Sequence, residues 1–259
     1  PPRFLYGYTT SFNYKKNPII RVLAEITNHF LRIWDFEVSQ RPDILVGNSK
    51  NVVERIKKFY RRNAIVLYPP VDLSEFVKGR TLKRVRPYEK DYFLALNRLV
   101  RGKGTEVVVK ACSDLSINLK VVGQGPELES LKEMAGKTIE FVNWVSDGER
   151  LELLSNAKAL ILASEDEDFG ITSIEAQGVG TPVVAVRSGG YLETVIEGKT
   201  GEFYGGPGMV TAAQLIPILK DFDPKKYDPK DCRKNAEKFS EENFKKQLMA
   251  IIEKGLTKD

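Results

Sequence analysis

Short apolar runs alternate with longer amphipathic stretches from residue 91 onward. The runs have the length of buried strands, and each is followed by a stretch whose apolar residues recur at helical spacing. We expect strands over 91–97, 117–123, 138–144, 158–163 and 181–186. Helices are expected over 104–114, 126–136, 147–157, 170–178 and 190–198. This alternation predicts βαβ units, and therefore an α/β fold with helices on both faces of a parallel sheet.

Residues 1–75 follow a less regular pattern. A long helical stretch covers 17–40, and two apolar runs, 43–49 and 64–71, predict strands. Two strands are too few for a doubly wound domain. We therefore expect residues 1–75 to be a partial domain that lacks its N-terminal half.

The remaining boundaries follow from composition. Residues 76–90 are rich in cations and contain Gly79 and Pro87, which predicts a linker between domains. A complete domain is then expected over 91–232. The last segment, 233–259, contains an amphipathic stretch with apolar residues at helical spacing, so we expect it to be helical.

Composition and charge narrow the class of protein. With 42% hydrophobic and 29% charged residues the chain resembles an ordinary globular protein, and no apolar run approaches the ~18 residues of a membrane span. Residues 1–90 hold 18 Lys and Arg against 8 Asp and Glu, whereas 91–259 hold 22 against 27. Six cations of the first part fall on one expected helix: Lys50, Arg55, Lys57, Lys58, Arg61 and Arg62.

Three interpretations of that basic helix remain open. It is a solvated helix face, a contact with an anionic membrane surface, or a contact with an anionic acceptor. Nucleic acid is disfavoured, because no recognised binding motif accompanies the charge.

Cysteine and histidine usage excludes several chemistries. Cys112 and Cys232 lie far apart without metal-ligand spacing, which favours two reduced thiols in a cytosolic protein. His29 is the only histidine and falls within a helical stretch, so we interpret it as structural. A single histidine disfavours histidine-based zinc sites and Ser-His-Asp catalysis.

The loops that follow the expected strands are rich in candidate chemistry, and ligands of open parallel sheets bind at this edge. Arg98 and Lys103 lie in the loop "NRLVRGKGTE", where two cations, glycines and a helix start suit an anionic phosphate. The alternative for this pair is solvated charge. Gly123 and Gly125 follow the next strand, where they allow close approach of a ligand or only a tight turn.

Four carboxylates, Glu165 to Asp168, lie where a buried strand meets a helix start, and Glu175 lies inside that helix. Ionised carboxylates accept hydrogen bonds from neighbouring hydroxyls, so one could hold a donor sugar and another a ribose diol. Three alternatives remain: a helix cap, a site for a hard metal ion, or a general acid/base pair.

Several of these segments resemble the retaining glycosyltransferase family 4. Its E-x7-E hallmark is matched by Glu167 and Glu175 in "EDFGITSIEA", which "GVGTPVVA" and "GGYLETV" follow. "NRLVRGKG", "VVGQGPE" and "DGERLELLSNAKALILAS" match further blocks in the same order. Upstream, "PPRFLYGY", "LRIWDFE", "DILVGNS" and "LYPPVD" are similar to the mannosyltransferase-like branch. Asp168 and Thr172 replace the glycine and proline often found in the family.

The resemblance implies a fold and a set of site residues. The fold would be GT-B, with a complete C-terminal Rossmann-like parallel-sheet domain, a partial N-terminal Rossmann-like domain, and C-terminal helices that return toward the latter. Glu167, Arg98 and Lys103 would be catalytic. The donor would be bound by Glu175, Gly123, Gly125, Trp144, Val145, Asp168, Phe169, Gly170, Ile171 and Thr172. No metal or other cofactor is expected, because Arg98 and Lys103 would neutralise the diphosphate.

The implied activity is retaining transfer of a hexose, expected to be mannose from GDP-mannose, to a glycan or lipid-linked acceptor. The alternative is a non-catalytic nucleotide-sugar-binding module or truncated pseudoenzyme, and the isolated chain is expected to transfer sugar poorly. The expected location is cytoplasmic, with peripheral contact between the basic N-terminal part and an anionic membrane.

Overall fold

A six-stranded parallel sheet forms the core of the larger domain in the computed structural model, which describes residues 1–7, 18–73, 90–206 and 208–256. The strands lie in the order β5-β4-β3-β6-β7-β8. Chain order therefore reverses between β3 and β6, which are neighbours at Leu94 and Leu160. In a doubly wound sheet, ligands bind beyond the carboxyl ends of the strands at such a reversal.

The strands are short and mostly buried. Their bounds are β3 Phe93–Leu96, β4 Leu119–Val122, β5 Ile139–Val142, β6 Leu160–Leu162, β7 Val183–Val186 and β8 Gly201–Tyr204. Every residue of β6 and β7 is buried, as expected for strands with helices on both faces. The α/β class and the parallel sheet are as predicted from the apolar runs.

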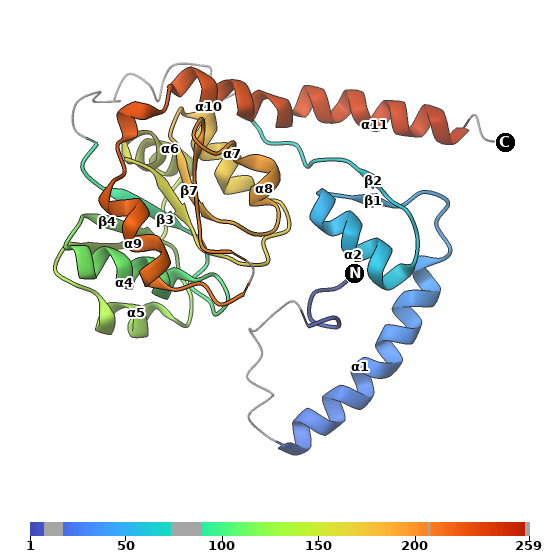
Figure 1. Cartoon of the computed structure of the whole chain (residues 1–259). Helices are drawn as coiled ribbons and strands as arrows, with labels where there is room; N and C mark the ends of the chain where they lie inside the picture. Colours follow the sequence, from blue (N-terminus) through green and yellow to red (C-terminus); the bar gives the residue numbers. More distant parts are fainter. Residues whose placement is uncertain (8–17, 74–89, 207, 257–259) are drawn as a thin grey trace.

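The helices of this domain gather in two groups, one around α4 and one around α7 (Figure 1). Helices α5 (Leu128–Met134) and α9 (Ala212–Lys220) pack against α4 (Thr105–Leu115). The other group comprises α6 Asp147–Asn156, α7 Ile171–Gly178, α8 Tyr191–Thr194 and α10 Pro229–Ala236.

The structure differs from the predicted elements in three respects. The helix expected over 190–198 ends at Thr194, because Val195 is extended and the Thr200 hydroxyl accepts a hydrogen bond from the Ile196 N–H. The sequence pattern did not predict β8, whose short run mixes Gly201 and Glu202 with two aromatic residues. Helices α9 and α10 were also not anticipated.

The N-terminal part is smaller and more open. It contains α1 (Pro18–Ser39), α2 (Lys50–Tyr60) and a two-stranded parallel sheet of β1 (Val46–Gly47) and β2 (Ile65–Val66). Each of these strands is two residues long, much shorter than the predicted runs. Helix α1 is continuous and extends away from the rest of the molecule (Figure 1), and many of its apolar side chains are exposed.

The N-terminal part joins the larger domain through a small apolar cluster. Val71 donates from its backbone N–H to the Phe239 carbonyl at 2.9 Å, and both pack with Phe169 and Ile174. Helix α11 (Glu241–Leu256) then passes the β1–β2 region (Figure 1), although none of its residues is fully buried. None of the helices in the described ranges is long and apolar enough to cross a membrane. The predicted linker, 76–90, lies almost wholly outside the described residues.

Candidate active site

A cavity of about 430 Å³ lies beyond the carboxyl ends of β3 and β6, at the reversal of strand order. Most of its wall comes from the two loops that follow these strands, and Asn48 and Pro69 close it from the N-terminal part. Eight predicted site residues line it: Arg98, Lys103, Glu167, Asp168, Phe169, Gly170, Ile171 and Thr172.

The loop after β3 places the two candidate cations. Gly104, with φ of +69°, lies so close to β6 that an added Cβ would be 2.4 Å from the Ala163 carbonyl oxygen. This close approach brings Lys103 beside the β6–α7 loop, where its Nζ lies 2.8 Å from Glu167 Oε2. Arg98 is exposed, and no ion pair joins it to another residue of the described part of the chain.

The loop after β6 leads into α7 through a glycine in the left-handed conformation. Gly170 has φ of +89°, and a Cβ added there would be 2.7 Å from the ring of Tyr191, which is buried. Ile171 and Thr172 line the cavity, and their backbone N–H groups lack intrahelical partners because these residues begin α7. These N–H groups and the helix dipole favour an anion at this point.

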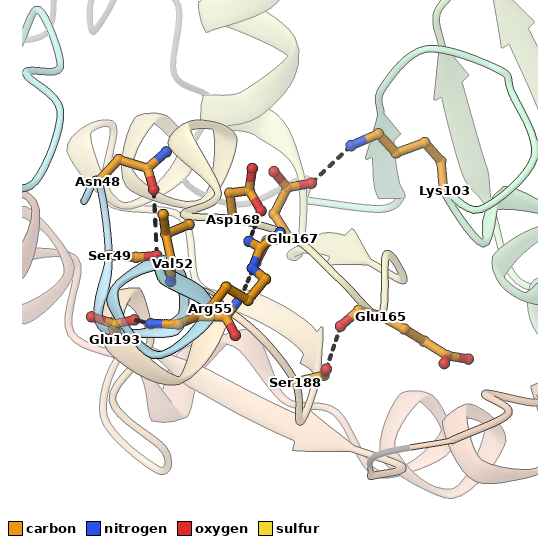
Figure 2. Close-up of polar contacts among 11 residues, drawn as sticks. Asn48, Ser49, Val52, Arg55, Lys103, Glu165, Glu167, Asp168, Ser188 and Glu193 are labelled. Atoms are coloured by element: carbon orange, nitrogen blue, oxygen red, sulfur yellow. Dashed lines mark hydrogen bonds and ion pairs between the residues drawn. The ribbon is translucent and has the colours of Figure 1, made fainter. Parts of the chain in front are cut away.

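The four consecutive carboxylates diverge to separate surroundings. The Glu165 carboxylate accepts from the Val210 N–H at 2.7 Å, and Asp166 is exposed. Glu167 pairs with Lys103 and Asp168 with Arg55, from opposite sides of the loop (Figure 2). In the described ranges no group of three or more His, Cys, Asp or Glu is placed to hold a metal ion.

Glu175 faces α6 and does not line this cavity. It forms an ion pair with Arg150, whose side chain is 25% exposed against 15% for that of Glu175. Burial lowers the pKa of the Arg150 guanidinium, but the hydrogen bonds and charges of Glu175 and Asp147 together raise it above its usual value. The two predicted carboxylates therefore lie in different electrostatic surroundings.

The other predicted donor-binding residues also lie outside the lining of the cavity. A Cβ on Gly123 would be 1.9 Å from the Asn97 carbonyl oxygen, and one on Gly125 would be 2.1 Å from that of Leu99. These glycines let the loop after β4 pass close to the loop after β3. Trp144 is 76% exposed, and Val145 is half-buried beside it.

A second cavity, of about 350 Å³, shares Arg98 and Lys103 with the first. Its wall adds Arg3 from the N-terminal part and Arg101, Glu165 and Asp166 from the two loops. Lys103 therefore lies between two adjoining hollows at the same edge of the sheet.

Sequence reasoning missed the contribution of the N-terminal part to this site. Asn48 and Pro69 lie in two segments that the family resemblance had marked, but neither was expected to line the site. Arg55 was counted among the cations of a basic helix, yet its side chain is only 6% exposed. For Arg55 the solvated-face interpretation is therefore wrong.

Comparison with known proteins identifies relatives of this architecture. The chain is 27% identical over 269 residues to a D-inositol 3-phosphate glycosyltransferase of Corynebacterium urealyticum, covering 88% of this chain and 63% of that protein. It is 31% identical over 193 residues to a GDP-mannose-dependent alpha-(1-6)-phosphatidylinositol monomannoside mannosyltransferase of Mycolicibacterium smegmatis, covering 62% of this chain and 50% of that protein. The chain thus spans less than two thirds of the length of these relatives.

Solved structures of GT-B glycosyltransferases share the fold. Sucrose-phosphate synthase from Thermosynechococcus elongatus superimposes with a TM-score of 0.73 at 23% identity, over 88% of this chain and 62% of that one. Anabaena HepE, solved in complex with UDP-glucose, gives 0.70 at 19% identity, over 88% and 68%. The family model for glycosyl transferases group 1 matches residues 82–239. By this match the chain belongs to the glycosyl transferases group 1 family.

Proposed function

We propose that this protein is a retaining, metal-independent glycosyltransferase that moves mannose from GDP-mannose to a glycan or lipid-linked acceptor. One observation carries the proposal: Arg98, Lys103, Glu167 and the N-terminus of α7 meet in one cavity at the strand-order reversal. The choice of mannose follows relatives such as the mannosyltransferase of Mycolicibacterium smegmatis.

Positive charge in this cavity suits a diphosphate leaving group. Negative charge develops on the diphosphate as the glycosidic bond breaks, and cations already in place stabilise it. We assign this role to Arg98 and Lys103, supported by the first N–H groups of α7. A diphosphate placed there would share Lys103 with Glu167, since Lys103 Nζ lies 2.8 Å from the Glu167 carboxylate.

The carboxylates suit the neutral parts of the donor. We assign Glu167 to the hydroxyls of the transferred sugar, because it lines the cavity beside Gly170 and Tyr191. We assign Glu175 to the ribose diol, which would then lie toward α6 and Arg150. Gly123, Gly125, Trp144 and Val145 would border the base on the same side.

The remaining parts of the proposal concern organisation and surroundings. We assign residues 91–232 to the donor and 1–75 to the acceptor side, with 233–259 bracing both. Exposed cations of the basic helix, such as Lys57 and Arg61, would contact an anionic membrane. Two buried free cysteines, Cys112 and Cys232, support a cytoplasmic location.

The test is calorimetric titration of the protein with GDP-mannose, UDP-glucose and ADP-glucose in the presence of EDTA. We expect GDP-mannose to bind most tightly and chelation to leave its affinity unchanged. Binding that requires added Mg²⁺ or Mn²⁺ would contradict the assignment of Arg98 and Lys103.

Turnover is followed separately by NMR of the product. Retention of the α-anomeric configuration supports the proposal, and inversion contradicts it. Tight binding without transfer to any mannosyl or lipid-linked acceptor would favour the non-catalytic module instead.

A further inference from the structure

An ion pair joins helix α2 of the N-terminal part to the loop that contains Glu167. The Arg55 guanidinium pairs with the carboxylate of Asp168, the residue directly after Glu167 (Figure 2). The Arg55 side chain is 6% exposed and that of Asp168 is 32% exposed. Because the guanidinium is largely withdrawn from solvent, loss of the Asp168 carboxylate should be costly, so this ion pair favours a fixed position of α2 relative to the loop.

Hydrogen bonds at the N-terminus of α2 form a second contact with the larger domain. The Glu193 carboxylate accepts hydrogen bonds from the backbone N–H groups of Lys50, at 2.9 Å, and Asn51, at 3.1 Å. It also accepts one from the Tyr68 hydroxyl at 2.9 Å. Here a carboxylate from α8 satisfies N–H groups that no helix can satisfy internally.

The backbone of Glu167 is held from both sides. The Asn51 side-chain amide donates to its carbonyl at 3.3 Å, and the Gly190 N–H donates to the same oxygen at 2.8 Å. Next along the chain, Phe169 is buried, with its ring stacked on Tyr68 at 5.6 Å between centroids. Each of residues 167–169 thus contacts the N-terminal part: the first two contact α2, and Phe169 contacts Tyr68, which follows β2.

We infer that Arg55 is a positioning residue that acts through Asp168 to hold the Glu167 loop in the geometry needed to receive the donor sugar. The inference rests on the proposed function for the role of Glu167. It also reassigns Asp168: its side chain holds Arg55 and does not bind the donor. This partner accounts for an acidic residue where the family often has glycine.

Different parts of the donor should respond differently to loss of the pair. Arg98 and Lys103 lie on the loop after β3 and not on the loop that contains Asp168, so we expect nucleoside diphosphate binding to persist. The contacts of the sugar depend on residues 167–169, so they should weaken. The informative quantity is therefore the ratio of the dissociation constants of GDP and GDP-mannose.

The experiment compares Arg55→Gln, Asp168→Asn and the double variant with the unsubstituted protein by calorimetry. We expect each single variant to lower the ratio about tenfold, which corresponds to ~1.4 kcal/mol, with little change for GDP. The double variant should lose no more than either single one, because both remove the same contact. Arg55→Lys should restore part of the ratio, and Lys57→Gln, an exposed cation on the same helix, should change nothing.

Hydrogen exchange of residues 165–170 provides a measurement independent of any ligand. We expect faster exchange there in Arg55→Gln and Asp168→Asn, and unchanged exchange in β4 and α5. If the unsubstituted protein bound no sugar nucleotide, the proposed function would fail while this exchange test still decided the positioning role. An unchanged ratio together with unchanged exchange in both variants would overturn the inference.

Discussion

Four adjacent carboxylates, Glu165 to Asp168, lie in the loop between β6 and α7 and face different surroundings. Glu165 caps a backbone N–H, Asp166 is exposed, Glu167 meets Lys103 and Asp168 meets Arg55. Of the four, Glu167 is the carboxylate that pairs with Lys103, which is a candidate to bind a diphosphate. Carboxylates that are adjacent in the sequence therefore have separate surroundings in the structure.

The residue types of the site were predictable from the sequence, but their partners were not. Cations and carboxylates after apolar runs indicated the edge of the sheet, because parallel strands bring such loops together. The contact between Asp168 and Arg55 spans residues far apart in the chain, and no local pattern encodes it. The pairing of Glu175 with Arg150 was missed for the same reason.

Arg98→Ala should weaken nucleotide-sugar binding without unfolding the protein. Loss of a charged hydrogen bond to the diphosphate is expected to cost about 1.5–3 kcal/mol of binding free energy. Because Arg98 is exposed, thermal unfolding should be unchanged. Lys110→Ala serves as the control, because it removes an exposed cation of α4 that lies outside the cavity. Equal affinity of Arg98→Ala and the unsubstituted protein in calorimetry would remove Arg98 from the donor site.

Gly170→Ala should destabilise the protein more than Gly198→Ala. Both glycines have positive φ, +89° and +71°, but only at Gly170 would the new Cβ contact another group, the Tyr191 ring. The backbone conformation alone should cost about 1–2 kcal/mol at either site, and displacement of the buried ring adds to it at Gly170. Urea unfolding measures the difference. Equal losses would mean that Tyr191 gives way freely and does not fix the start of α7.

At the scale of elements, buried strands were easier to predict than edges and ends. The central strands β6 and β7 are apolar at every position, so their runs stand out in the sequence. Strand β8 begins with Gly201 and Glu202, so it has no continuous apolar run. Helix α8 ends where Val195 becomes extended. In the part of the chain that the structure describes, β1 and β2 form a two-stranded sheet, and each is two residues long.

The docking of α2 should weaken at alkaline pH. Burial, aided by the hydrogen bond to Glu193, raises the pKa of the Tyr68 phenol from 10.0 to about 12. A phenol with a raised pKa in the folded state contributes stability that is complete below pH 10 and is lost as the pH rises through about 12. The free energy of unfolding should therefore fall across this window, and less steeply in Tyr68→Phe. Identical pH dependence of the two proteins, measured by urea unfolding, would show that Tyr68 does not report on this contact.

At the scale of the whole molecule, two parts of unequal size meet at the site. The six-stranded domain supplies Arg98, Lys103, the N-terminus of α7 and Glu167, whereas the N-terminal part supplies Asn48, Pro69 and the ion pair of Arg55 with Asp168. The family and the fold class followed from motif order and apolar periodicity. The arrangement of α2 against the Glu167 loop required the structure, because it depends on contacts between distant segments.

The most direct test of the central claim is a crystal structure of the protein with GDP-mannose. The diphosphate is expected within hydrogen-bond distance of Arg98, Lys103 and the first N–H groups of α7, with the mannose hydroxyls on Glu167. A nucleotide at the opposite edge of the sheet, in the hollow of about 390 Å³ lined by Asp91, Lys120 and Glu140, would contradict the account.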